Sequence, residues 1–368
     1  MVEWKKLGEI CEVQRGKRLT KNLLDENAAY PVYHGGLEPL GKYGQYNREA
    51  NTVMVINVGA SAGTVGFSDC RFWSSDGCFC ISHSELLDNK YLFYYLQTKT
   101  HYLQSQVRHA GIPTLDNPVV EKINLPLLSL PEQNRIVSIL DTFTSSIDNL
   151  KQQIAQRRKQ YEYYRDQLLD FEGKDEKDIH TWGEFCEMIK GNGVQKVDFV
   201  DEGVGCIHYG QIYTHYGPYT YETNKFVSQE VFENARKASK GDIIMTDTSE
   251  NVEDICKSVA YLGEDDIAVS NHALIIKHKQ NPKFLSFSTQ TKSFFLQKRK
   301  VVVGVKVSGI KPEHLAQIRI YLPSLSEQER IVDILDKFET SIQNLESQLS
   351  QREKQYEYYR NKLLTFED

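Results

Sequence analysis

The chain has 368 residues, of which 40% are hydrophobic and 26% charged, a composition typical of a globular protein with two or three domains. It contains no apolar run of the ~20 residues that span a membrane and no apolar N-terminal segment typical of a signal peptide, so we expect a cytoplasmic protein. The seven cysteines are odd in number and form no Cys-x-x-Cys pair, which argues against a disulfide framework or a zinc site.

The formal net charge of −6 is unusual for a protein that binds nucleic acid. The charge is distributed unevenly, however. Residues 1–128 hold 13 basic and 13 acidic side chains, whereas residues 326–368 hold 6 basic and 10 acidic ones. The acidic excess therefore lies mostly at the C-terminal end, and the rest of the chain remains compatible with a locally basic surface.

Residues 1–128 alternate short β-rich segments with glycine-containing turns, which predicts an α+β domain. Strands are expected near residues 29–33, 52–56 and 78–81. A helix is expected over residues 89–104. The glycine-rich segment 59–66 lacks the lysine of a nucleotide-binding loop, so we interpret it as a turn between two strands.

Residues 129–173 are predicted to form one long helix that begins with a capping box, Ser129 to Glu132. Apolar residues recur at alternating spacings of four and three from Ile136 to Phe171, which is the period of a coiled coil. At 1.5 Å per residue the helix is on the order of 60 Å long. A single apolar stripe of that length requires a partner helix.

Residues 174–323 form a second predicted α+β domain, entered through the charged stretch 174–178. Strands are expected near residues 242–245 and 273–276, and a helix near residues 282–298. The chain closes with a second long helix, residues 324–368, which repeats the capping pattern and the apolar stripe of the first.

The two helical segments are copies of each other. Residues 132–171 and 327–366 are identical at 26 of 40 positions with a constant offset of 195. Gly8–Glu12 also matches Gly183–Glu187 at an offset of 175, so the two globular parts begin in the same frame. The duplication predicts a pseudo-two-fold fold in which the two helices pair antiparallel as a coiled coil, with one globular part near each end.

Arg157 and Arg352 interrupt the apolar stripes at equivalent positions. Either their stems pack while their guanidinium groups reach water, or they set the register by pairing with a carboxylate. In the tyrosine clusters that follow, the spacing favours packing and leaves Tyr163 and Tyr358 to face a partner protein.

No catalytic arrangement is recognisable. The sequence has no glycine-rich cofactor loop after a strand, no metalloprotease motif, no nuclease carboxylate–lysine cluster and no Ser/His/Asp pattern. The segment 116–119 has only a superficial likeness to the Asp/Asn-Pro-Pro-aromatic loop of DNA amino-methyltransferases. We therefore expect a non-catalytic protein without a cofactor or a bound metal.

Loops that combine basic or amide side chains with aromatic ones are candidates for contacting nucleic acid. In the first domain the candidates are Arg15, Lys17, Arg18, Lys21, Lys42, Tyr43 and Arg108. In the second domain they are Lys196, Tyr209, Gln211, Tyr213, Thr248, Asn251, Lys298 and Arg299. Lys298 and Arg299 belong to the densest basic cluster and suit phosphates. Each candidate is equally compatible with an ordinary solvated loop.

The start of each helix resembles the specificity subunits of type I restriction-modification enzymes. The matching residues are Leu130-Pro131-Glu132-Gln133-Asn134-Arg135-Ile136-Val137-Ser138-Ile139-Leu140 and Leu325-Ser326-Glu327-Gln328-Glu329-Arg330-Ile331-Val332-Asp333-Ile334-Leu335. The one departure is Ser326, where the first copy has Pro131. The resemblance covers essentially the whole chain.

The resemblance implies that residues 1–128 and 174–323 are target-recognition domains, each reading one half of a split, asymmetric site in double-stranded DNA. It implies that the helices 129–173 and 324–368 are spacers that fix the gap between half-sites and dock two adenine methyltransferase subunits. Restriction subunits join the complex, and no membrane is involved. Two other hypotheses stay open: a coiled-coil adaptor that binds proteins without reading DNA, and an enzyme such as a nuclease.

Overall fold

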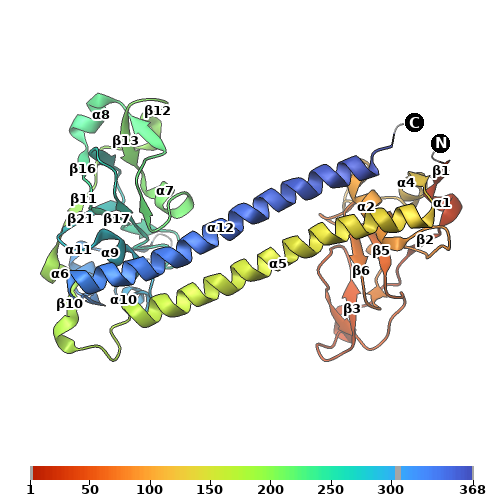
Figure 1. The fold of residues 1–368 in the computed structure, drawn as a ribbon, viewed down its shortest axis with the longest axis horizontal. Coiled ribbons are helices and arrows are strands. Elements are labelled where there is room, and N and C mark those ends of the chain that lie inside the picture. The colour runs from red at the N-terminus through yellow and green to blue at the C-terminus, as the bar shows by residue number, and fades with distance from the viewer. Residues whose placement is uncertain (1–2, 303–307, 367–368) are drawn as a thin grey trace. The chain divides into compact units, whose positions relative to one another are not determined.

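The computed structural model describes residues 3–302 and 308–366. Its contacts divide the chain into two compact units. Unit 1 runs to Gln152 and resumes at Glu346, and unit 2 holds Gln153–Leu345. Each unit contains one globular head and one half of each of two 40-residue helices, α5 (Leu130–Leu169) and α12 (Leu325–Leu364) (Figure 1). The two predicted long helices are thus confirmed.

The head of unit 1 is built on a four-stranded antiparallel sheet in the order β2-β8-β5-β6. Its strands are β2 (Val13–Arg15), β8 (Cys78–Ile81), β5 (Thr52–Ile56) and β6 (Val65–Ser68). Every residue of β5 and β8 is buried. Because successive side chains of a strand point to opposite sides, both faces of these strands are covered. Val53 and Phe79 pack toward α2 (Asn89–Thr98), whereas Met54 and Cys80 pack against Phe72.

A smaller sheet in the order β4-β3-β7 covers the other side of this head. Its strands are β4 (Gly41–Tyr43), β3 (Tyr30–Tyr33) and β7 (Trp73–Ser74). The remaining elements are β1 (Glu3–Lys6), paired with β9 (Asn124–Leu127), and α1 (Leu7–Ile10), η1 (Lys21–Leu23), α3 (Thr100–Ser105) and α4 (Asn117–Glu121). The helix expected over residues 89–104 is therefore two helices, which meet at Lys99.

The head of unit 2 contains two five-stranded sheets, in the orders β11-β21-β17-β19-β14 and β12-β15-β13-β20-β16. The first comprises β11 (Cys186–Lys190), β21 (Ala273–His278), β17 (Ile243–Thr246), β19 (Ser258–Tyr261) and β14 (Tyr219–Thr220). The second comprises β12 (Phe199–Val200), β15 (Lys225–Val227), β13 (Val204–Ile207), β20 (Ile267–Val269) and β16 (Arg236–Ala238). Side chains alternate as in unit 1: Ile243 and Leu274 face α9 (Pro282–Ser288), and Ile244 and Ile275 face the second sheet.

Shorter elements complete unit 2. The helices are η2 (Glu176–Asp178), α6 (Trp182–Phe185), η3 (Lys196–Asp198), α7 (Tyr209–Thr214), α8 (Gln229–Asn234), α10 (Lys292–Val301) and α11 (Pro312–Leu315). The strand pairs are β10 (Ile179–Thr181) with β23 (Arg319–Tyr321), and β18 (Thr248–Ser249) with β22 (Ser308–Gly309). None of the helices in the described ranges is long and apolar enough to cross a bilayer.

The two heads share one frame. In each, the first strand of the main sheet pairs antiparallel with a late strand, β2 with β8 and β11 with β21, and a glycine follows it. A Cβ atom on Gly16 would lie 2.1 Å from the Ser75 carbonyl oxygen, and one on Gly191 would lie 2.4 Å from that of Ser270. The same close backbone approach therefore occurs in both copies, and only glycine fits it. The predicted internal duplication is confirmed in the fold.

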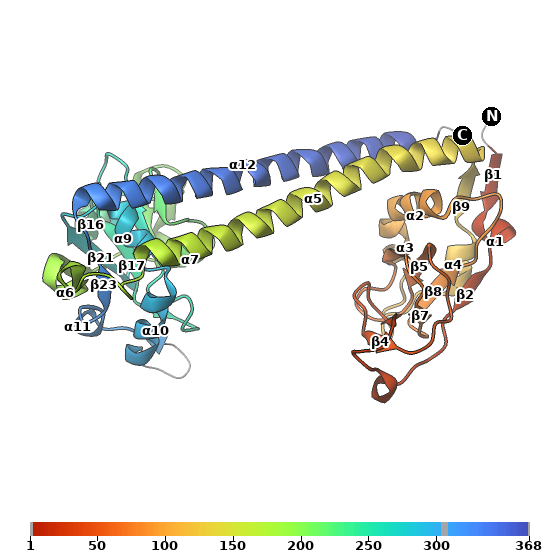
Figure 2. The same cartoon turned by 60° about the horizontal axis from the view of Figure 1, so that its bottom comes forward.

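Within each unit the two helices run antiparallel (Figures 1 and 2). In unit 1 the Phe143 ring stacks on Tyr359 at 5.2 Å, and the Arg352 guanidinium lies 5.7 Å above Phe143. Unit 2 repeats this arrangement: Phe338 stacks on Tyr164 at 5.5 Å, and Arg157 lies 5.8 Å above Phe338. Both arginines therefore make cation–π contacts with the facing helix.

The two glutamates of the expected capping boxes, Glu132 and Glu327, pair with arginines instead. Both carboxylate oxygens of Glu132 accept hydrogen bonds from Arg135, at 2.7 and 2.9 Å. Glu327 and Arg330 form the same pair at 2.7 and 2.8 Å. The arginine one turn along the helix offers two donors in a fork that matches a carboxylate, so it replaces the predicted reach back to the N-cap amide.

Candidate nucleic-acid interface

Four of the seven candidate residues of unit 1, at positions 15, 17, 18 and 21, flank the close approach at Gly16. The backbone of this segment is held firmly: Trp73 Nε1 donates to the Lys17 carbonyl at 2.9 Å, and Arg15 Nε donates to the Asp76 carbonyl at 3.0 Å. The Tyr43 ring meets the Trp73 ring edge-on at 5.1 Å, which brings β4 to the same place. The structure thus gathers the candidates from residues 15–21 and β4 into one surface, away from α5 within this unit (Figure 2).

The cations on this surface are available to a ligand. The side chains of Lys17, Arg18, Lys21 and Lys42 are exposed, and none forms an ion pair within the described residues. An unpaired cation on a fixed backbone suits a phosphate, because no internal pair has to be broken on binding. Arg108 differs, since its Nη2 lies 2.7 Å from Asp116 Oδ1 and its charge is already compensated.

In unit 2 the equivalent loop carries Lys196 in η3, exposed and without an ion pair among the described residues. Its neighbour is an aromatic cluster around Tyr209, whose ring lies 4.3 Å from that of His208 and 5.3 Å from that of His272. Burial lowers the pKa of His208, and the nearby charges of Lys196 and His272 lower it further. His208 is therefore a neutral packing residue at pH 7.

Three other candidates in unit 2 use their polar groups inside the protein. Gln211 accepts from the His208 amide at 2.8 Å and donates to Asn224. The Tyr213 hydroxyl donates to the Thr248 carbonyl. The Asn251 side chain closes a turn, accepting from the Asp254 amide and donating to its carboxylate, both at 2.8 Å. These groups shape the loops and have little capacity left for base edges.

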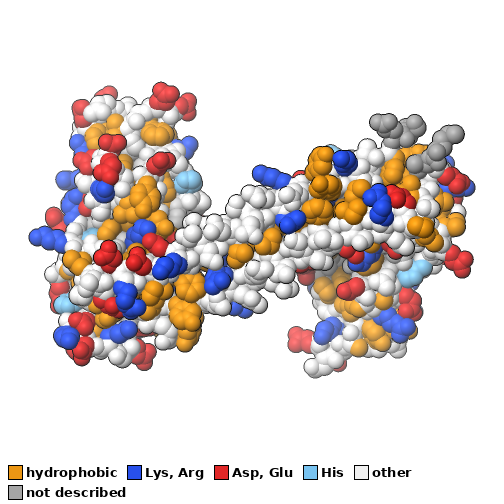
Figure 3. Space-filling view, viewed as in Figure 1, with side chains coloured by type: hydrophobic (Ala, Val, Ile, Leu, Met, Phe, Trp, Pro, Cys, Tyr) orange, Lys and Arg blue, Asp and Glu red, His pale blue; other side chains and the backbone are white. Residues whose placement is uncertain are grey.

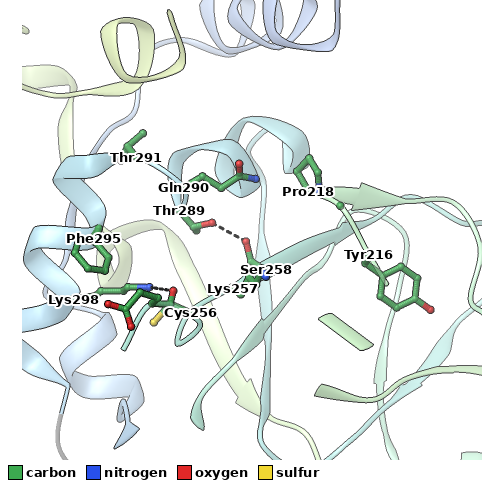
Figure 4. A pocket seen from close by; sticks show the side chains of 12 residues that line it. Tyr216, Pro218, Cys256, Lys257, Ser258, Thr289, Gln290, Thr291, Phe295 and Lys298 are labelled. Carbon is green, nitrogen blue, oxygen red and sulfur yellow. Dashed lines mark hydrogen bonds between the residues drawn. The ribbon is translucent and has the colours of Figure 1, made fainter. Parts of the chain in front are cut away.

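The prediction for Lys298 is wrong. Its side chain is 4% exposed, and its ammonium group donates to the carbonyls of Glu253 at 2.8 Å and Ile255 at 2.5 Å. Lys298 is one of the side chains that line a cavity of about 350 Å³, and Figure 4 shows how these side chains lie. Burial lowers the pKa of Lys298. This lysine anchors α10 to the loop between β18 and β19, whereas its neighbour Arg299 is exposed and stays a candidate.

Basic and acidic side chains are interspersed over both heads on the face drawn in Figure 3. No single-signed area dominates that face, in keeping with the near-neutral charge of the first head. Contacts to phosphate would therefore come from a few loops, such as the one after Gly16, rather than from a broad basic face.

Sequence reasoning missed the most deeply placed polar residues of the long helices. Gln133 and Gln328 are both 0% exposed, each at the fourth residue of its helix. Their identity in the two copies is visible in the repeat, but the repeat does not indicate that they are buried. Trp73, which holds the Lys17 carbonyl, was also missed, and no pattern in the sequence pointed to it.

Comparison with known proteins follows the same lines. The family model for the type I restriction modification DNA specificity domain matches residues 1–157 and 175–352. The chain is 28% identical over 398 residues to the EcoR124I/EcoR124II type I restriction enzyme specificity subunit of Escherichia coli, covering 99% of this chain and 94% of that one. It is 25% identical over 335 residues to the MjaVIII specificity subunit of Methanocaldococcus jannaschii, covering 86% and 78%.

Solved structures agree on the fold. The S subunit of a type I restriction-modification system from M. genitalium superposes with a TM-score of 0.64 at 17% identity, covering 100% of this chain and 97% of that one. A chain from a structure of type I system assembly and conformational transition gives a TM-score of 0.58 at 17% identity, covering 98% and 96%. With the two matched domains, these likenesses show that the chain belongs to the family of type I restriction-modification DNA specificity subunits.

Proposed function

We propose that this chain is the non-catalytic DNA-reading subunit of a type I restriction-modification complex, with each head reading one half of a split, asymmetric site in double-stranded DNA. The observation that carries the proposal is the shared frame of the two heads. The same strand pairing and glycine approach recur in both, and the loop that follows carries η1 in the first head and η3 at the equivalent residues of the second, while the sequence of that loop differs. A common scaffold with different loops suits two readers of different sequences.

The loops supply the chemistry that this proposal needs. In the first head Arg15, Lys17, Arg18, Lys21, Lys42 and Tyr43 lie on one surface, and in the second head Lys196, Tyr209, Thr248 and Arg299 remain candidates. Lysine and arginine contact phosphates, and the tyrosines can pack against sugars or exposed bases. We assign the functional domains as residues 1–128 and 174–323 for the heads, and 129–173 and 324–368 for the spacers.

The long helices are proposed to dock two methyltransferase subunits, through which restriction subunits join. Tyr163 and Tyr358 are 61% and 59% exposed, and each lies edge-on to its neighbouring tyrosine at 5.3 Å. That neighbour is stacked on a phenylalanine of the facing helix. Rigid, exposed tyrosines are typical anchors of protein interfaces. Their occurrence at equivalent places in the two copies suits two copies of one partner.

Insertion of one heptad into the first helix tests the spacer role. Seven residues add about 10 Å to a helix and preserve the apolar stripe. The matched insertion into the second helix keeps the pair in register. We expect the double-insertion chain, with its methyltransferase, to bind the same half-sites at a longer gap in gel-shift titrations. Undiminished binding to the original gap would contradict the spacer role, and no binding of the parent chain to any DNA would favour the protein-only adaptor.

A further inference from the structure

The joint between each head and its long helix centres on a fully buried glutamine. In unit 1, Gln133 accepts a hydrogen bond from the Asp88 amide at 2.7 Å and donates to the carbonyls of Leu86 at 3.0 Å and Leu128 at 2.8 Å. Asp88 is the N-cap of α2, its carboxylate accepting from the Tyr91 amide at 2.9 Å. One side chain therefore connects the start of α5 to the start of the head helix that packs on it.

Unit 2 builds the same joint. Gln328 accepts from the Asn281 amide at 3.0 Å and donates to the Pro323 carbonyl at 2.8 Å and to Gln280 Oε1 at 2.9 Å. Asn281 is the N-cap of α9, its side chain accepting from the Phe284 amide at 3.2 Å. Five of the six groups that meet the two glutamines belong to the backbone. The joint therefore persists although the two head sequences have diverged.

A second attachment lies two turns further along each helix. Lys90 on α2 pairs with Asp141 at 2.6 Å in unit 1, and Lys283 on α9 pairs with Asp336 at 2.7 Å in unit 2. Apolar packing between the helices is non-directional and permits small rotations. Two hydrogen-bonded points on one helix face remove that freedom, and the glutamine is the deeper of the two, with every polar group bonded.

From these contacts we infer that Gln133 and Gln328 are positioning residues that lock the angle at which each head is held on its spacer helix, and thereby restrict the complex to one gap between half-sites. The inference rests on the proposed function. Neither glutamine lies on the candidate DNA surface, because both are inaccessible to solvent. Their loss should therefore change which gaps are accepted and leave the base preferences of each half-site unchanged.

The experiment is a selection from DNA duplexes with a randomised interior, using the full chain in complex with its methyltransferase. Three chains are compared: the parent, Gln133→Leu and, as a matched control, Gln156→Leu, which removes an exposed glutamine from the same helix. We expect parent and control to recover two half-sites at one gap. We expect Gln133→Leu to recover the same half-sites at several gaps, with affinity for the parent gap lowered about tenfold by the unpaired buried groups.

Gln133→Met guards against a variant that fails to fold. It keeps the length and close to the volume of the side chain, brings no charge into the buried site, and removes the three hydrogen bonds. Gap broadening in this variant, with unchanged half-sites and a cooperative melt, supports the inference. A single unchanged gap in a folded variant overturns it. If the parent itself recovers no split site, the proposed function fails instead, so the two failures are distinguishable.

Discussion

The stability of unit 2 should depend on pH through the carboxyl group of Glu339. Burial in unit 2 raises the pKa of its carboxyl group from an ordinary value of 4.5 to about 7. The Tyr161 hydroxyl, 3.3 Å away, opposes the rise by donating to the carboxylate; the charge of Asp336 reinforces it and that of Lys283 opposes it. When the pKa of an acidic group is higher in the folded state than in the unfolded state, the protein loses stability as the pH rises from the lower pKa to the higher one.

The magnitude follows from the two pKa values. At about 1.4 kcal/mol per pH unit, the full penalty of ionising Glu339 in the folded state is at most about 3.5 kcal/mol. The side chain is only partly buried by area, so solvent reduces this penalty, and we expect about 2 kcal/mol between pH 5 and pH 8. Glu339→Gln removes the charge, and the amide oxygen of the glutamine still accepts the hydrogen bond that the Tyr161 hydroxyl donates. It should therefore be nearly neutral at pH 5 and stabilising by about 2 kcal/mol at pH 8.

The assay is equilibrium denaturation at pH 5 and pH 8, read by a brief hydrogen-exchange pulse at fixed pH. Peptides from α9 report unit 2, and peptides from α2 report unit 1, where Thr144 occupies the place equivalent to Glu339. Glu329→Gln, an exposed carboxylate on the same helix, is the control. A stability difference between Glu339→Gln and the parent that is the same at both pH values would refute the reasoning.

Three further predictions concern other parts of the molecule. Gly16→Ala should destabilise unit 1 by about 2–3 kcal/mol in denaturant melts, because the new Cβ would lie 2.1 Å from the Ser75 carbonyl oxygen. Gly44→Ala places its Cβ in open space and should not destabilise the unit. Equal effects of the two substitutions would disprove the close approach. Tyr94→Phe should cost about 1–2 kcal/mol by leaving Asp141 Oδ1 without the donor now at 2.6 Å, and an unchanged melt would show that bond to be unimportant. Replacing Lys17, Arg18 and Lys21 with Gln should reduce the slope of log affinity for DNA against log salt concentration by the equivalent of up to about three phosphate contacts. Lys240→Gln, which removes a charge paired with Glu264, should leave the slope unchanged. An unchanged slope in the triple variant would remove this loop from the interface.

The sequence was most informative where a pattern repeats. The spacing of apolar residues from Ile136 onward predicted α5, and the offset copy predicted α12 and the duplicated frame. These predictions succeed because periodicity depends only on which residues are apolar, and burial of one helix face follows directly from it.

Predictions about single polar side chains were less successful, since their role depends on partners far away in the sequence. Lys298 sits in a run of basic residues, yet two carbonyls of a distant loop enclose it. Gln133 recurs as Gln328 in the repeat, yet no pattern in the sequence indicates that it donates to the carbonyls of Leu86 and Leu128. Only the folded chain reveals such acceptors, because the type of a side chain specifies how many donors it has but not which acceptors they contact.

Methylome sequencing of cells that express this chain with its cognate methyltransferase tests the central claim most directly. The account predicts a new split, asymmetric motif with methyladenine in each half, absent from cells that carry the methyltransferase alone. Exchange of the first head for that of another family member should then alter one half of the motif only. No new methylated motif from a complex shown to be assembled and active would contradict the account.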